Sequence, residues 1–237
     1  MISINKLPLD IIDEITKKIR PIGEGFMGLA DVMYMLKIRY GSEEGLLFAE
    51  NISNTIQATM QKASVDLAKE RGTYPAWKGS EWDKRGIKIR NSSLVSIAPT
   101  GSISFLAGVS GGLEPNYGLC YNRRTYDGNI YYIANYIFKN ELERLEIYSE
   151  ELMEKISKNR GSCQGIKEIP KELQDIFVIA SDLTPQEHVN TVSIVQKNVD
   201  LSCSKTINFS NKATVKDIYD IIIYSWKKGL KGLTVYR

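Results

Sequence analysis

The stretch SIAPTGSISFLAGVSGGLEPNYG, residues 96–118, decides how the rest of this chain is understood. An apolar run at 94–98 predicts a buried strand, which Pro99 ends. Small residues follow at once, namely Thr100, Gly101, Ser102 and Ser104, and glycines recur at positions 108, 111 and 112. A glycine lets a ligand approach the main chain, while exposed backbone N–H groups and hydroxyls can hold a phosphate. The segment predicts either such a phosphate cradle, without the GK[ST] of a Walker loop, or an ordinary turn rich in small residues.

A second glycine motif, GEGFMG at residues 23–28, matches GxGxxG literally. A dinucleotide fingerprint needs a strand before its first glycine, so that the turn meets a pyrophosphate. The residues before this motif have helical spacing instead, and no acidic residue on a strand follows at the required distance. We therefore predict a tight turn between two helices here rather than a nucleotide site.

Length and composition describe a globular protein. The chain has 237 residues, of which 43% are hydrophobic and 25% charged, enough to bury a core without disulfides. The net charge is +3, and Lys and Arg are spread along the chain rather than clustered in a basic stripe. No apolar run approaches the roughly 20 residues of a membrane span, and MISINKLPLD lacks a signal-peptide core. We expect neither nucleic acid nor a membrane as a partner.

Cysteine and histidine are scarce. The three cysteines, Cys120, Cys163 and Cys203, form no CxxC pair, so the four close ligands of a zinc site are missing and no metal site is predicted. Their odd number and wide spacing are typical of reduced thiols, which favours a cytoplasmic location. A Ser-His-Asp triad would have to use His188, the single histidine. It shares one side of a predicted helix with three valines, so we prefer a half-buried structural histidine.

Periodicity and capping signals predict alternating helices and strands. The expected helices cover 9–20, 26–38, 43–71 and 184–198, with another from Thr214 that Gly229 closes. Helical spacing also runs through 129–158, and strands are expected at 94–98, 202–210 and 233–237. Capping boxes pair Thr184 with Glu187 and Thr214 with Asp217, while Ser42 and Gly72 suit the two ends of the long helix. Without repeats or low-complexity linkers, residues 1–237 are predicted as one α/β unit.

Several long motifs together resemble the catalytic subunit of ribonucleotide reductases, most nearly the adenosylcobalamin-dependent class. The resemblance is carried by NSSL (91–94) running into SIAPTGSIS, by LAGVSGGLEPNY (106–117) and by YNRR (121–124). Other segments follow the family's order, namely RPIGEGFMGLADV (20–32), ASVDLAKERGTYP (63–75), DLTPQEHVNTVSIVQKNVDLSCSKTINF (182–209) and GLKGLTVYR (229–237). The likeness spans nearly the whole chain, and residues 125–158 are its least distinctive part.

The resemblance implies that residues 1–237 are the C-terminal portion of a ten-stranded α/β barrel. In this family the barrel reduces ribonucleotides to deoxyribonucleotides by a radical route. The resemblance also implies a loop that binds the substrate phosphates through backbone amides and small hydroxyls: Pro99, Thr100, Gly101, Ser102 and Ile103. The glycines at 108, 111 and 112 would shape the return turn, and Glu114 would be structural, paired with a nearby arginine, rather than catalytic.

The C-terminus favours the cobalamin class. Iron-dependent members relay a radical through two adjacent tyrosines near the matching place, whereas this chain has LTVY at 233–236. The resemblance therefore implies adenosylcobalamin as the cofactor of the complete enzyme, with a thiol reductant such as thioredoxin as a partner.

The parts of the family that carry the radical chemistry lie upstream of the region that this chain resembles. They are the thiyl-radical cysteine, an asparagine and a glutamate beside it, and a redox-active cysteine pair. We therefore assign no catalytic residue to this chain and expect a separate N-terminal half as its partner, attracted by open barrel edges. We favour one piece of a split reductase, and two alternatives stay open: an inactive remnant that binds nucleotide phosphates, and a regulatory module that pairs with an intact reductase. The sequence does not choose between a diphosphate and a triphosphate substrate.

Overall fold

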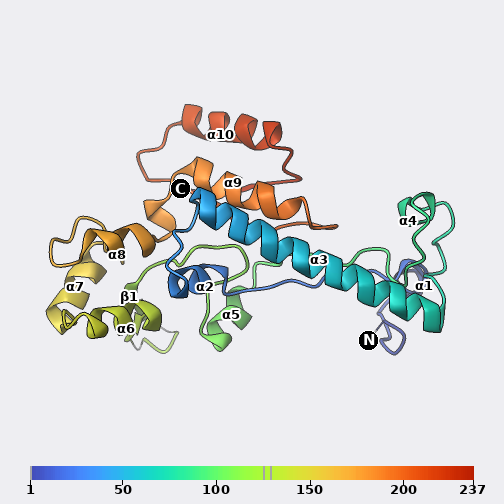
Figure 1. The fold of residues 1–237 in the computed structure, drawn as a ribbon, viewed down its shortest axis with the longest axis horizontal. Helices are drawn as coiled ribbons and strands as arrows, with labels where there is room; N and C mark the ends of the chain where they lie inside the picture. The colour runs from blue at the N-terminus through green and yellow to red at the C-terminus, as the bar shows by residue number, and fades with distance from the viewer. Residues whose placement is uncertain (1, 125, 129) are drawn as a thin grey trace. The chain divides into compact units, whose positions relative to one another are not determined.

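The computed structural model describes residues 2–124, 126–128 and 130–237, and Figure 1 labels its α-helices and strand β1. The chain divides into two compact units. The first comprises Met1–Gly25, Glu50–Ala98 and Val195–Cys203, and the second comprises Phe26–Ala49, Pro99–Ile194 and Ser204–Arg237. The candidate phosphate loop belongs to the second unit.

The first unit contains α1 (Asp10–Ile19), most of α3 (Glu43–Arg71) and the short α4 (Glu81–Lys84). The predicted bounds of α3 are confirmed. The Ser42 hydroxyl accepts a hydrogen bond from the Gly45 N–H at 3.0 Å, and Gly72, with φ of +75°, follows the last helical residue. These local signals define both ends of a helix of 29 residues.

The glycine motif at 23–28 pairs at Glu24 with the segment around Val95, where we expected a tight turn between two helices. Hydrogen bonds run from the Glu24 N–H to the Leu94 carbonyl (2.7 Å) and from the Ser96 N–H to the Glu24 carbonyl (2.9 Å). A side chain at Gly25 would place its Cβ 2.5 Å from the Ser96 carbonyl oxygen, so only glycine permits this approach. The motif is therefore a packing feature rather than a nucleotide site.

The predicted strand at 94–98 is not a regular strand. It forms two isolated parallel bridges, Val95 with Glu24 and Ile97 with Cys203. The Leu94 and Val95 N–H groups both donate to the Asp200 carboxylate, at 2.7 and 3.1 Å. The Asp200 side chain thus accepts hydrogen bonds from two consecutive backbone N–H groups, one of which would otherwise pair with a neighbouring strand.

The second unit contains the remaining elements. Its helices are α2 (Leu29–Met35), α5 (Gly101–Ala107), α6 (Tyr136–Arg144), α7 (Glu150–Lys158), α8 (Lys171–Ile176), a 3₁₀ turn (Ala180–Asp182), most of α9 (Pro185–Gln196) and α10 (Val215–Lys227). The helical prediction for 129–158 is corrected to a strand followed by two helices, and the helix expected at 26–38 is shorter. Both predicted capping boxes are confirmed, since Thr184 pairs with Glu187 and Thr214 with Asp217.

Four strands are present in the described part of the chain, and they form two separate sheets. An antiparallel pair joins β1 (Cys120–Arg124) to β2 (Ile130–Ala134). A parallel pair joins β3 (Thr206–Asn208) to β4 (Thr234–Tyr236), which are shorter than the strands predicted there. The fold is mixed α/β as predicted, and these described strands do not close into a barrel.

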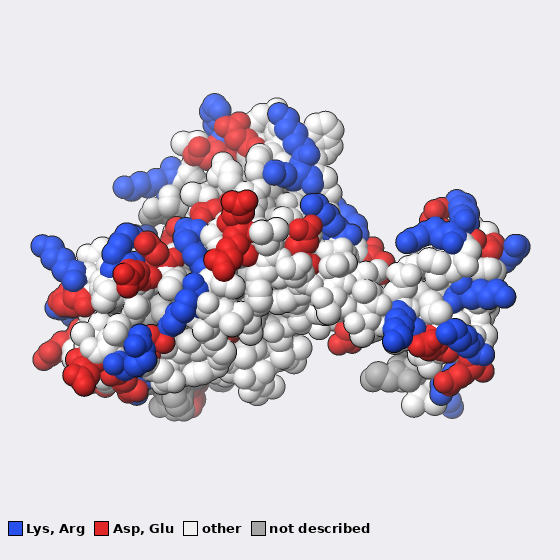
Figure 2. Space-filling view, in the orientation of Figure 1, with Lys and Arg blue, Asp and Glu red and all other residues white. Residues whose placement is uncertain are grey.

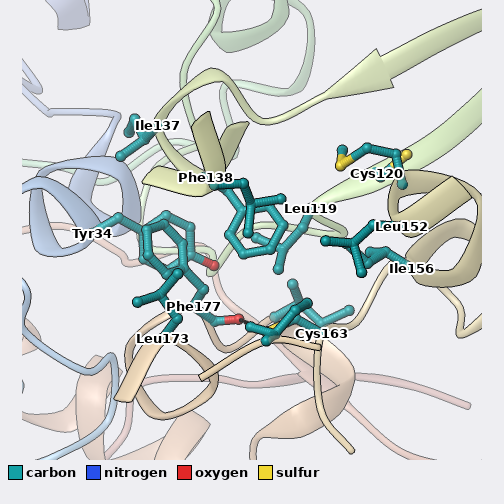
Figure 3. Close-up of a cluster of buried hydrophobic side chains, with 14 residues drawn as sticks. Tyr34, Leu119, Cys120, Ile137, Phe138, Leu152, Ile156, Cys163, Leu173 and Phe177 are labelled. Carbon is teal, nitrogen blue, oxygen red and sulfur yellow. Dashed lines mark hydrogen bonds between the residues drawn. The ribbon is translucent and has the colours of Figure 1, made fainter. Parts of the chain in front are cut away.

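The larger hydrophobic core of the second unit lies among α6, α7 and α8. Phe138 and Phe177 are fully buried with ring centroids 5.0 Å apart, and the ring centroid of Tyr34 lies 4.7 Å from that of Phe177. Figure 3 shows these three side chains within the cluster. The buried Tyr34 hydroxyl donates to the Val178 carbonyl at 2.6 Å, so the core leaves that polar group satisfied.

The surface carries charges of both signs. Figure 2 shows Lys and Arg side chains interspersed with Asp and Glu over the face in view. Among the described residues, no helix combines the length and apolar content that crossing a bilayer requires.

Candidate functional site

The loop predicted to bind phosphate opens α5. Thr100 precedes the helix in the left-handed region, with φ of +51°, and Gly101 is the first helical residue. The first-turn N–H groups of a helix have no intrahelical acceptor, and in α5 no side chain caps them either. Pro99, Gly101, Ser102 and Ile103 are exposed and Thr100 is half-buried. The structure thus places the five predicted residues together at the surface.

Open space surrounds the critical glycine. A Cβ added at Gly101 would meet nothing within 4 Å, and the backbone there has an ordinary φ. A ligand can therefore approach this part of the main chain closely, as the composition of the loop suggested.

One hydroxyl that we expected at this surface is turned away from it. Ser104 is only 6% exposed, and its N–H donates to the Thr100 carbonyl at 2.8 Å as part of the first helical turn. The Thr100 hydroxyl accepts a hydrogen bond from the Gly112 N–H at 2.8 Å. Its own hydrogen can still be donated to a ligand.

The return segment, residues 108–114, packs closely behind the loop. Gly108 and Gly112 have positive φ values of 69° and 44°. A Cβ at Gly111 would lie 3.0 Å from the Pro99 carbonyl oxygen and 3.3 Å from the Thr100 hydroxyl. The predicted role of these glycines in the return turn is consistent with this geometry.

Two buried side chains anchor the return segment. Asp31, which is 3% exposed, accepts a hydrogen bond from the Ser110 N–H at 2.5 Å and further bonds from the Asn116 and Asn135 amides. The Tyr40 hydroxyl donates to the Leu113 carbonyl at 2.5 Å. Neither residue was singled out from the sequence, because nothing local marks a buried partner about 75 residues away.

Glu114 pairs with a lysine, not with the arginine that we expected. Its Oε2 lies 2.7 Å from Nζ of Lys205, whose side chain is 2% exposed. Its Oε1 accepts a hydrogen bond from the Thr206 N–H at 2.6 Å. Lys205 also contacts Nδ1 of His188 at 2.8 Å, and His188 is fully buried rather than half-buried.

Two of the three cysteines, Cys120 and Cys163, are fully buried. Burial raises the pKa of the Cys163 thiol to about 12, with a smaller contribution from Asp182. Cys203 is half-buried, and none of the three forms a disulfide. A reactive cysteine needs an accessible thiolate with a lowered pKa, so Cys163 does not fit that role. Within the described ranges, no cluster of three or more His, Cys, Asp or Glu side chains could hold a metal ion.

A cavity of about 790 Å³ lies in the second unit, and sequence reasoning missed it. Its lining includes Asn208 and Tyr236, the last residues of the parallel strands β3 and β4. Ligands of α/β proteins commonly bind beyond the carboxyl ends of parallel strands. A sequence signal for this cavity was available in the polar run that follows β3, SNKA at 210–213.

Comparison with known proteins assigns the class of this fold. A family model described as "Ribonucleotide reductase, barrel domain" matches residues 1–89 and 85–236. The chain belongs to this family of ribonucleotide reductase barrel domains.

The relatives specify the family further. The chain is 41% identical to the vitamin B12-dependent ribonucleoside-diphosphate reductase of Thermoplasma acidophilum, over 100% of this chain and 31% of that protein. It is 35% identical to the protein of the same name from Mycobacterium tuberculosis, over 100% of this chain and 34% of the relative. The class Id ribonucleotide reductase alpha subunit of Actinobacillus ureae matches in structure with a TM-score of 0.86 and 26% identity, covering 99% of this chain and 42% of that one. The chain therefore spans about a third of the length of these B12-dependent relatives.

Proposed function

We propose that this chain supplies the substrate-phosphate site of a ribonucleotide reductase whose radical chemistry resides on an N-terminal part. The whole enzyme would reduce ribonucleotides to deoxyribonucleotides within a ten-stranded α/β barrel, of which this chain forms the C-terminal portion. The names of the relatives favour a ribonucleoside diphosphate as the substrate.

The observation that carries this proposal is the exposed, uncapped first turn of α5. No side chain caps its N–H groups, a Cβ at Gly101 would meet nothing within 4 Å, and the Thr100 hydroxyl has a hydrogen left to donate. Several N–H donors that converge on one point suit an anion, and a phosphate is the anion that a nucleotide brings. Pro99, Thr100, Gly101, Ser102 and Ile103 would act together, the backbone providing most of the donors.

Adenosylcobalamin would serve the complete enzyme, and the chain's single histidine does not fit the role of a cobalt ligand. His188 is fully buried, with Nε2 facing the Ala180 carbonyl at 3.1 Å and Nδ1 facing Lys205. A thiol reductant such as thioredoxin would regenerate cysteines of the N-terminal part.

A reconstitution experiment tests the proposal. The chain is mixed with the upstream part of a B12-dependent relative, separated by size-exclusion chromatography, and assayed with adenosylcobalamin, a dithiol and a ribonucleoside diphosphate. We expect a complex that forms deoxyribonucleotide, while neither part does so alone. A folded chain that binds nucleotide but neither the upstream part nor an intact reductase would favour the remnant. Binding to an intact reductase with altered turnover would favour the regulatory module.

A further inference from the structure

We infer that Lys205, Glu114 and His188 are positioning residues that hold the phosphate loop in its binding conformation. The inference rests on the proposed function of residues 99–103, and it adds three residues that touch no substrate. The ion pair of Lys205 with Glu114 is the central contact, and His188 supports it from the other side.

The ammonium of Lys205 has three hydrogens to donate, and three acceptors surround it. These are Oε2 of Glu114 at 2.7 Å, Nδ1 of His188 at 2.8 Å and the Thr206 carbonyl at 2.5 Å. An ammonium group can only donate, so these three acceptors use all three of its hydrogens and no donor is left for another ligand. A buried lysine with this complete set of partners can keep its charge.

The same contacts determine the protonation of His188. Because Lys205 can only donate, Nδ1 must present its lone pair. The ring proton then resides on Nε2, which donates to the Ala180 carbonyl at 3.1 Å. Burial and the neighbouring ammonium lower the pKa of His188 to about 3, so the neutral Nε2–H form is expected at neutral pH.

A continuous path of contacts joins this network to the phosphate loop. The Glu114 N–H donates to the Gly111 carbonyl at 2.7 Å, at the end of the return segment. The neighbouring Gly112 N–H donates to the Thr100 hydroxyl at 2.8 Å. Thr100 lies in the left-handed region, which L residues with a branched side chain rarely adopt unless their surroundings hold them there.

The network fixes the far end of this path against β3 and α9. Glu114 bonds both the Lys205 ammonium and the Thr206 N–H, while His188 belongs to α9. Removing the ammonium would leave the Glu114 carboxylate without its ionic partner and Nδ1 of His188 without its donor. The return segment would then shift, and Thr100 would lose the support that keeps the first turn of α5 open to phosphate.

The test uses the full chain, and its single histidine serves as a spectroscopic probe. Nitrogen NMR of His188 should show a neutral ring protonated at Nε2 in the wild type at pH 7. Hydrogen exchange is followed at the Ser104 and Gly112 amides, which bond Thr100, and at the amides of α6 as a reference. Binding of inorganic phosphate and of ADP is measured by titration.

The main variants are Lys205→Met and Glu114→Gln. Glutamine has nearly the same shape as glutamate, so Glu114→Gln provides the test if Lys205→Met fails to fold. We expect the Ser104 and Gly112 amides to exchange about tenfold faster or more, with little change in α6. Phosphate and ADP should bind about tenfold more weakly or worse, because misplacement by about 1 Å is costly. In the matched control, Lys171→Met removes an exposed ion pair with Asp175 and should change none of these quantities.

The readouts separate this inference from the proposed function. If the wild-type chain failed to bind phosphate, the proposed function would be contradicted. Hydrogen exchange and nitrogen NMR of His188 would still test whether Lys205, Glu114 and His188 hold the loop in place. Unchanged Ser104 and Gly112 exchange in both variants would overturn the positioning role. So would equal acceleration throughout α6 and the loop, which marks a general loss of stability, or a wild-type His188 protonated at Nδ1.

Discussion

Two adjacent segments of the second unit, the α5 loop (99–107) and the return segment (108–114), have opposite physical character. In the α5 loop, Ile103 is 56% exposed and Leu106 is 83% exposed. In the return segment, Leu113 is fully buried, and the backbone groups of Ser110 and Leu113 bond to buried side chains. Under the proposed function, the exposed segment would offer donors to a ligand, and the buried segment would keep those donors in place.

This division predicts how mutations should differ between the two segments. Changes among the anchors of the return segment should cost folding free energy, because they leave buried polar groups unsatisfied. Changes in the α5 loop should cost ligand affinity with little effect on folding, because few atoms surround it.

The largest effect is expected for Asp31→Ala. This change would leave the Ser110 N–H and the amides of Asn116 and Asn135 without their shared acceptor. We expect the free energy of unfolding to fall by about 3 kcal/mol or more, because each buried donor left without an acceptor costs about 1–3 kcal/mol. Urea denaturation measures this loss. A loss no greater than that of Asp10→Ala, an exposed residue of α1, would contradict the anchoring role of Asp31.

Acidification gives the next effect, through His188. Its pKa in the folded chain is about 3, against 6.5 ordinarily, because burial and the Lys205 ammonium disfavour the charged ring. The unfolded chain therefore binds the proton first, and stability is lost as the pH falls from about 6.5 toward 3. The contribution of His188 approaches about 1.4 kcal/mol for each pH unit within that window.

Denaturation at several pH values compares the wild type with His188→Asn, which cannot titrate there. Lys205, Glu114 and Glu187 are the charged groups that interact with the histidine, directly or through Lys205, and all three are retained in this variant. The variant should show a shallower dependence of stability on pH. Equal slopes for the two proteins would mean that His188 accepts its proton as readily folded as unfolded.

A smaller loss is expected for Tyr40→Phe. The change removes only the hydroxyl that donates to the buried Leu113 carbonyl and leaves the ring in place. An unsatisfied buried acceptor costs about 1–3 kcal/mol of unfolding free energy. Tyr219→Phe, in which an exposed hydroxyl is lost, is the control and should be neutral. Equal stability of both variants would show that the Tyr40 hydroxyl does not anchor the return segment.

The smallest effect on stability is expected for Gly101→Val, in the α5 loop. A valine side chain would meet no described atom near its Cβ and would need no unusual φ. We expect a change of about 1 kcal/mol or less from helix propensity, measured by thermal unfolding. Affinity for phosphate should nevertheless collapse, because the side chain occupies the space where the ligand meets the main chain. A large loss of stability would place Gly101 with the anchors instead.

The sequence predicted well those features that depend on neighbours along the chain. The ends of α3 and the capping boxes of α9 and α10 are set by residues within one helical turn, so their signals are local. The strand expected at 94–98 was wrong because Asp200, more than 100 residues away, accepts two of its amide hydrogens.

In the candidate site, too, some residues were predictable from one stretch of sequence and others depend on distant segments. Residues 99–103 were visible in the composition of one short stretch, and the burial of Ser104 follows from the helix that starts there. The anchors Asp31, Tyr40 and Lys205 come from distant segments, so no single stretch of sequence could reveal them. Glu114 was recognised as structural, but the identity of its cationic partner required the three-dimensional arrangement.

The most direct test of the central claim is an NMR titration of the full chain with ADP, observing the backbone amides of Gly101, Ser102 and Ile103. Adenosine, which lacks the phosphates, and the Gly101→Val variant are the controls. We predict that ADP shifts these three amides in the wild type, that inorganic phosphate shifts the same amides more weakly, and that neither control does so. Binding of ADP that leaves the three amides unmoved, or shifts caused equally by adenosine, would contradict a phosphate site at the start of α5.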